Sequence, residues 1–132
     1  LYGNQIAKNA QTLSKELISL GFNLVTGGTD NHLMVVDLNN KDISGKQAES
    51  ALSKAGITVN KNTVPFDPRS PYDPSGIRLG TPALTTRGMK EKEMKQVAAW
   101  IDEAVKNNSD EKYLAALHEK ITIFAKDFPL PN

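Results

Sequence analysis

The sequence predicts an α/β chain, specifically a two-layer α+β sandwich in which a small, mostly antiparallel sheet carries helices on one face. Apolar residues recur at helical spacing near both ends of the chain, and short β-branched runs bounded by glycine, asparagine and proline lie between them. No repeat or change in composition marks a linker within the 132 residues, so we expect a single domain over residues 1–132.

Composition and charge argue against several classes of protein. Sixteen basic and fifteen acidic residues give a net charge of +1, so charge alone predicts no nucleic-acid partner. Cysteine is absent, which excludes disulfides, thiol catalysis and thiolate metal sites. No apolar run predicts a membrane span and no signal peptide is evident, so we expect a cytoplasmic protein. Because the chain opens inside a helical pattern without an initiator methionine, we expect it to be the C-terminal part of a larger protein.

The first third predicts a helix followed by two strands. Gly21 stands where a helix commonly ends, Asn23–Val25 reads as a short strand, and residues 26–31 are rich in turn formers. Residues 32–38 are apolar enough for a buried strand that pairs with the first. The helical stripe comprises Ile6, Ala10, Leu13, Leu17 and Leu20.

A second helix begins at a capping box, with Ser44 at the cap and Gln47 three residues later, and ends at Gly56. The β-branched run 57–60 predicts a third strand, and residues 76–80 predict a fourth. Thr81 and Pro82 predict a short helical turn that ends at Gly88.

Two helices close the chain, and residues 128–131 follow in extended form. The second of them starts at Ser109-Asp-Glu, where acidic side chains favour the positive helix end. Their apolar stripes comprise Met94, Val97, Ala98, Ile101 and Val105 in the first, and Leu114, Leu117, Ile121 and Phe124 in the second.

The segment between the third and fourth strands is the candidate functional region. Four prolines, at positions 65, 68, 71 and 74, favour a long, stiff, extended loop. Loops of this length inside small domains are usually functional or disordered, and the aromatic residues Phe66 and Tyr72 favour an ordered one. The same spacing is also compatible with a polyproline II ligand of an SH3-type groove, although such ligands usually lie in disordered tails.

Arg78 is the sharpest candidate for binding. Its guanidinium group matches a carboxylate bidentately, and Gly76 and Gly80 allow a ligand or another backbone to approach the strand. The alternative is an ordinary solvated arginine on an edge strand. Asn60 and Asn62 could bind a polar heterocycle or cap the strand end, and the residues alone favour neither.

The remaining polar residues predict no catalytic or metal site. His32 and His118 lie on different predicted elements, with no carboxylate spacing that completes a metal site. The glycine-rich residues 26–29 lack the lysine and the length of a phosphate-binding loop.

Four motifs in register resemble the C-terminal domain of serine hydroxymethyltransferase, and Thr85-Thr-Arg-Gly-Met agrees with it. They are Thr26-Gly-Gly-Thr-Asp-Asn-His, Gly56-Ile-Thr-Val-Asn-Lys-Asn, Val64-Pro-Phe-Asp-Pro-Arg-Ser-Pro and Ser75-Gly-Ile-Arg-Leu-Gly-Thr-Pro-Ala. The resemblance implies the C-terminal domain of a homodimeric type I pyridoxal-phosphate enzyme. That enzyme transfers the hydroxymethyl carbon of serine to tetrahydrofolate, which leaves glycine.

The resemblance also implies roles for individual residues. Arg78 would bind the α-carboxylate of the amino acid, Asn62 would contact the folate pteridine, and Ser70, Pro71 and Tyr72 would line the folate side. The family often has phenylalanine where this chain has Tyr72, and no role is implied for Arg87 or His32.

The resemblance covers only the last third or so of such an enzyme. The segment with the Schiff-base lysine, the phosphate-binding residues and the aspartate at the pyridine nitrogen have no counterpart in this chain. We therefore expect no catalytic or cofactor-binding residue here and no activity from this chain alone. The domain of another type I enzyme, such as an aminotransferase or an aldolase, is the closest alternative.

Overall fold

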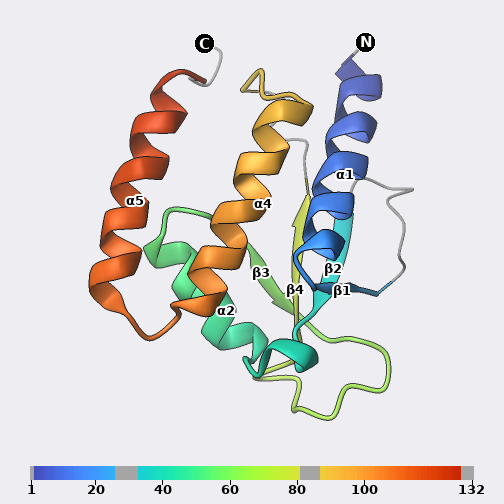
Figure 1. Ribbon diagram of the computed structural model, residues 1–132. Helices are drawn as coiled ribbons and strands as arrows, with labels where there is room; N and C mark the ends of the chain where they lie inside the picture. Colours follow the sequence, from blue (N-terminus) through green and yellow to red (C-terminus); the bar gives the residue numbers. More distant parts are fainter. Residues whose placement is uncertain (1, 26–32, 81–86, 129–132) are drawn as a thin grey trace.

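The computed structural model describes residues 2–25, 33–80 and 87–128 (Figure 1). The predicted turn at 26–31, His32, most of the helical turn at 81–88 and the extended end after Phe128 lie outside the described residues. The elements, in order, are α1 (Tyr2–Ser19), β1 (Asn23–Leu24), β2 (Leu33–Asp37), the 3-10 helix η1 (Asn39–Lys41), α2 (Gly45–Lys54), β3 (Asn60–Asn62), β4 (Gly76–Gly80), α4 (Glu91–Lys106) and α5 (Glu111–Lys126).

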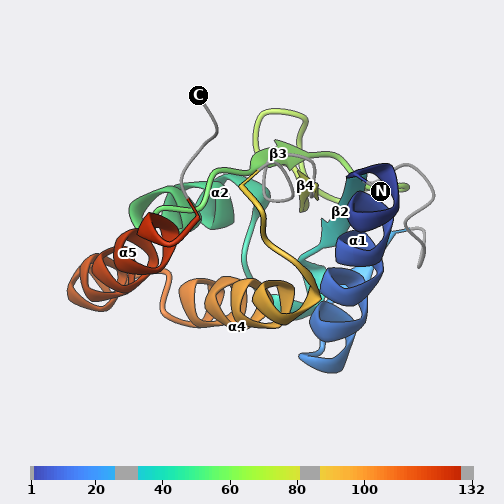
Figure 2. The ribbon, with the colours of Figure 1, turned by 90° about the horizontal axis from the view of Figure 1, so that it is seen from above.

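The described strands form one antiparallel sheet in the order β1-β2-β4-β3, which confirms the predicted α/β class and the antiparallel pairing. Figure 2 shows α1 and α4 lying together beneath the sheet, with α2 beside its β3 edge and α5 farther out. Helices therefore cover one face of the sheet, as the sequence predicts. None of the described helices is long and apolar enough to cross a membrane.

The core lies between the sheet and these helices because each element turns its apolar stripe inward. The predicted stripe of α4 is buried, and so is that of α1 up to Leu17, whereas Leu20 after α1 and Ile121 and Phe124 near the end of α5 are only partly buried against the core. The largest fully buried side chains include Leu13, Leu17, Met34, Leu38, Ile43, Leu52, Ile77, Met94, Ile101, Leu114 and Leu117.

The helix ends follow the sequence signals closely. Ser44 and Gln47 form the predicted capping box, and Gly56 ends the α2 segment with a φ of +92°, which glycine adopts without strain. Gly21 follows α1 in the same way, with a φ of +91°. At α5 the cap is Asp110 rather than Ser109, since the Asp110 side chain accepts from the backbone N–H of Tyr113.

The predicted strand over 57–60 is wrong. β3 comprises residues 60–62, and its first paired residue is Asn60, opposite Arg78. The preceding residues leave α2 through a turn in which the Ile57 N–H donates to the Leu52 carbonyl, while Val59 is buried. The β-branched run therefore marked a connection whose apolar members, Ile57 and Val59, pack against the core, which strands and such connections have in common.

Candidate functional site

Arg78 lies on the bare face of the sheet, the face that the described helices do not cover. Its strand neighbours Ile77 and Leu79 are buried toward the helices, and successive side chains of a strand point to opposite faces. Arg78 pairs with Val35 on one side and with Asn60 on the other, so these three residues form a row across β2, β4 and β3. Among the described residues the Arg78 side chain is exposed, and no ion pair or hydrogen bond of its guanidinium group is found. The cation is therefore available to an external anion.

Asn62 shares this face. It lies two residues after Asn60 on β3 and pairs with Gly76, so it is a diagonal neighbour of Arg78. Its side-chain amide donates to the Thr63 carbonyl at 2.8 Å, as a strand-end residue does. The structure thus brings Asn62 and Arg78 together on one surface. The Asn62 side chain also makes a strand-end hydrogen bond, the other role that the sequence left open.

Close backbone packing explains the glycine at the start of β4. A Cβ added to Gly76 would lie 2.8 Å from a Val64 methyl and 2.9 Å from the Val36 carbonyl oxygen. Gly76 therefore admits another backbone, as the sequence suggested, and the neighbours that approach it are the loop and β2 rather than a ligand.

The proline-rich loop at residues 63–75 is ordered but not extended, so that part of the prediction is wrong. Figure 1 shows it bulging from one end of the sheet, between β3 and β4. Turns lie at residues 65–66 and 71–72, and Phe66 has a φ of +55°, in the left-handed region. Polyproline II requires a negative φ throughout, so these turns argue against an SH3-type ligand.

A single carboxylate organises the loop. Asp67 Oδ2 accepts from the backbone N–H groups of Val64 (3.2 Å) and Ser75 (2.9 Å). Asp67 Oδ1 accepts from the Arg69 N–H (2.8 Å) and from the Ser75 hydroxyl (2.5 Å). Desolvation raises the pKa of Asp67, but the hydrogen bonds from Ser75, Arg69 and Val64 outweigh it and lower the pKa to about 2. The carboxylate is therefore charged at any physiological pH.

The second half of the loop is attached to the first turn of α2. Asp73 accepts from the Lys46 N–H at 3.2 Å, and hydrogen bonding from the Ser44 side chain is the main cause that lowers its pKa. The Gly45 N–H donates to the Pro74 carbonyl at 2.7 Å. The loop is thus fixed both internally and to a helix terminus.

The aromatic rings do not order the loop, contrary to the prediction. The Phe66 side chain is fully exposed and Tyr72 is 87% exposed. Ser70 and Pro71 are exposed too, so the residues predicted to line the folate side form an outward surface of the loop. Order comes instead from the hydrogen bonds between Asp67 and the buried Ser75.

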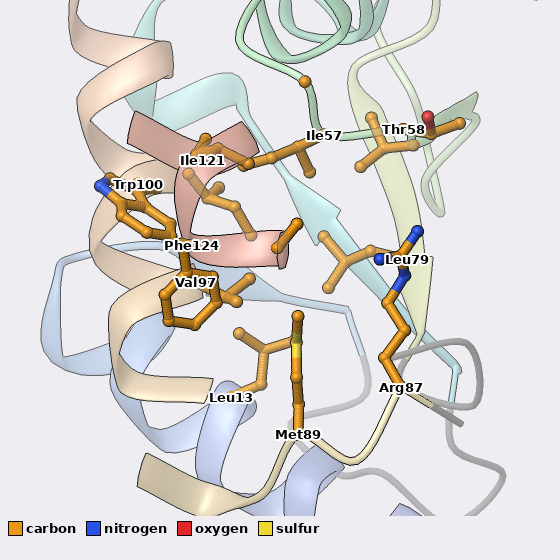
Figure 3. A pocket seen from close by; sticks show the side chains of 14 residues that line it. Leu13, Ile57, Thr58, Leu79, Arg87, Met89, Val97, Trp100, Ile121 and Phe124 are labelled. Carbon is orange, nitrogen blue, oxygen red and sulfur yellow. The ribbon is translucent and has the colours of Figure 1, made fainter. Parts of the chain in front are cut away.

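A second feature is a mostly apolar cavity of about 310 Å³ on the opposite, helix-covered side of the sheet (Figure 3). Its wall includes Met89, Trp100 and Phe124 but none of the predicted site residues. Arg87 lies at this wall, and its Nη1 donates to the Phe128 carbonyl at 3.1 Å. Arg87 therefore has a structural partner in a region separate from Arg78.

The described residues hold no group of histidine, cysteine and carboxylate side chains suited to a metal ion. His118 is exposed on α5, where it lies against Gly56.

Sequence reasoning missed Asp67, Asp73 and Gly45. Asp67 had a usable signal, because an aspartate whose side chain accepts from the N–H two residues later is a common turn former. Asp73 and Gly45 had none, since their contacts join segments that are far apart in sequence.

Comparisons with known proteins identify the family of this chain. The protein-family model for serine hydroxymethyltransferase matches residues 1–101. The chain is also 53% identical over 137 aligned residues to the serine hydroxymethyltransferase of Acidothermus cellulolyticus, covering 99% of this chain and 32% of that relative. The chain therefore belongs to the serine hydroxymethyltransferase family, and it spans about a third of the length of this curated relative.

Proposed function

We propose that this chain is the C-terminal domain of a serine hydroxymethyltransferase. The parent enzyme interconverts serine and tetrahydrofolate with glycine and 5,10-methylenetetrahydrofolate, using pyridoxal 5'-phosphate as cofactor. This domain supplies the arginine that binds the substrate carboxylate and part of the folate site. The observation that carries the proposal is Arg78, an exposed cation without an ion pair among the described residues, in a chain of this family.

Arg78 has the chemistry for the carboxylate. Its guanidinium group presents two parallel N–H donors, so it fixes both the position and the orientation of a carboxylate. A fixed carboxylate restricts rotation about the bond to the α-carbon, which holds the reacting bonds of serine in one geometry. The central strand β4 positions the arginine, with pairing partners on both sides.

Asn62, Ser70, Pro71 and Tyr72 form the proposed folate surface. An asparagine amide can both donate to and accept from a pteridine, and the Tyr72 ring presents an apolar face. Because the loop is already held by Asp67 and Asp73, little conformational entropy is lost when folate binds.

The described residues do not fit pyridoxal phosphate. No lysine or acidic side chain lines the cavity. In the row of residues on the bare face the cation is an arginine, Arg78, and not the lysine that a Schiff base with the cofactor needs. We therefore assign the cofactor to the part of the parent enzyme outside this chain.

The chain alone is then inactive, and its partners are the rest of the parent polypeptide and a second subunit of a cytoplasmic homodimer. Mixing the 132-residue chain with pyridoxal phosphate should give no stoichiometric absorbance of a bound cofactor. A band like that of the parent enzyme would contradict this assignment.

The main test is Arg78→Ala in the parent enzyme. Loss of a bidentate, charge-assisted contact should weaken serine binding at least roughly 100-fold, while the absorbance of the bound cofactor persists. Lys120→Ala, which removes an exposed cation on α5, is the control and should leave serine binding unchanged. A normal KM for serine in the Arg78 variant would overturn the role of Arg78.

A related type I enzyme, such as an aminotransferase or an aldolase, would also use a carboxylate-binding arginine. Dependence of serine cleavage on tetrahydrofolate separates the two functions, because only the proposed enzyme requires a one-carbon acceptor. Serine cleavage at the same rate without tetrahydrofolate would favour the alternative.

A further inference from the structure

We infer that Asp67 is the positioning residue of the folate surface. Its carboxylate accepts hydrogen bonds from both ends of the loop and so fixes the positions of Ser70, Pro71 and Tyr72 relative to Arg78. This rests on the proposed function and deepens it. Asp67 itself lies at the base of the loop and need not touch either substrate.

The connectivity of Asp67 supports this role. Val64 is the second residue of the loop and Ser75 is the last, and both donate to Asp67 Oδ2. The same carboxylate therefore ties the strand that bears Asn62 to the strand that bears Arg78. The Ser75 side chain that donates to Oδ1 is fully buried, so solvent reaches this contact only from the half-buried Asp67 side.

The folate surface lies between two fixed points. On one side, Asp67 Oδ1 accepts from the N–H of Arg69, the residue before Ser70. On the other side, the Asp73 side chain, one residue after Tyr72, accepts from the first turn of α2. The Asp73 N–H also donates to the Ser70 carbonyl at 3.0 Å. The exposed side chains of residues 70–72 make no hydrogen bond, ion pair or ring contact with the described part of the chain. Their direction is therefore set by these backbone anchors.

The charge of Asp67 matters as well as its shape. Four donors converge on two carboxylate oxygens, and only an ionised carboxylate accepts from all of them. An asparagine has one oxygen, and its NH₂ group would face donors at the other position. The low pKa of Asp67 agrees with this arrangement.

Asp67→Asn in the parent enzyme tests the inference. We expect the KM for tetrahydrofolate to rise at least about tenfold, the effect of losing one hydrogen bond to a charged group. The dissociation constant of serine, followed by cofactor absorbance in the absence of folate, should stay within about twofold of the parent value. A general loss of structure would change both constants. A rise in the folate KM without a change in the dissociation constant of serine therefore identifies a positioning role.

Two further variants and a control keep the test decisive. Ser75→Ala removes only the hydroxyl donor, should fold normally, and should raise the folate KM by a smaller factor. The double variant should be no worse than Asp67→Asn alone, because the two residues act through one contact. Asp127→Asn, an exposed carboxylate after α5, is the matched control and should change neither constant.

The outcomes separate the two levels of the proposal. A folate KM within twofold of the parent value in both Asp67→Asn and Ser75→Ala would overturn the positioning role, as would equal shifts in the folate and serine constants. Serine cleavage by the unmodified enzyme that ignores tetrahydrofolate would instead overturn the proposed function.

Discussion

Gly45→Ala should destabilise this chain, although alanine is normally the better residue in a helix. A Cβ at position 45 would lie 2.3 Å from the Gly76 carbonyl oxygen and 2.8 Å from the Pro74 carbonyl oxygen. The first distance is more than 1 Å short of ordinary contact at about 3.4 Å. Both atoms belong to the backbone, so no side chain can rotate away to relieve the contact.

The magnitude follows from two opposing effects. Overpacking a closely packed site costs about 1–3 kcal/mol, and replacing glycine by alanine in a helix returns at most about 1 kcal/mol. The net loss of unfolding free energy should therefore be about 1–2 kcal/mol. With a typical urea dependence, the unfolding midpoint would fall by roughly 1 M.

Urea unfolding of the 132-residue chain, followed by circular dichroism, measures this loss. Lys46→Ala, at the next position of α2, which is exposed, is the control. It should change the free energy of unfolding by less than about 0.5 kcal/mol. A Gly45→Ala chain as stable as the original, or more stable, would refute the reasoning, since the helical gain would then exceed the steric cost.

Three further effects should be measurable in the same chain. Ser44→Ala should cost about 1 kcal/mol, because it removes the hydroxyl that accepts from the Gln47 N–H at 3.2 Å; an unchanged urea midpoint would contradict this. The folded pKa of Asp67, about 2, lies below its ordinary value of 3.8, so its contribution is complete above about pH 4 and is lost as the pH falls through 2. Asp67→Asn should therefore flatten the stability profile between pH 4 and 2, and a profile identical to the original would argue against that contribution. Leu114→Ala should cost about 2–5 kcal/mol because Leu114 is fully buried, whereas Ile123→Ala, at a position 65% exposed, should cost well under 1; equal losses in thermal melts would show that α5 is not attached through Leu114.

The sequence predicted the elements that depend on local signals. The apolar stripes of α1 and α4 and the capping box at Ser44 determine helices within a few residues, without reference to the rest of the chain. Alternation around Arg78 also identified β4, because burial on one face leaves a clear period of two.

Features set by distant partners could not be predicted in this way. Whether residues 57–59 pair in the sheet depends on β4, and the β-branched run itself indicates only burial. The four prolines restrict individual φ angles, but the turns between them follow from hydrogen bonds that converge on Asp67. The placement of Asn62 and Arg78 on one face depends on the register of β3 against β4, which only the structure supplies.

The shared acceptor at Asp67 has a consequence for amide hydrogen exchange. The N–H groups of Val64, Arg69 and Ser75 all donate to one carboxylate, although they are spread along the loop. When the Asp67 side chain moves away from these N–H groups, all three amides lose their acceptor in the same opening event. They should therefore exchange with one common protection factor, as a single cooperative unit of the native state.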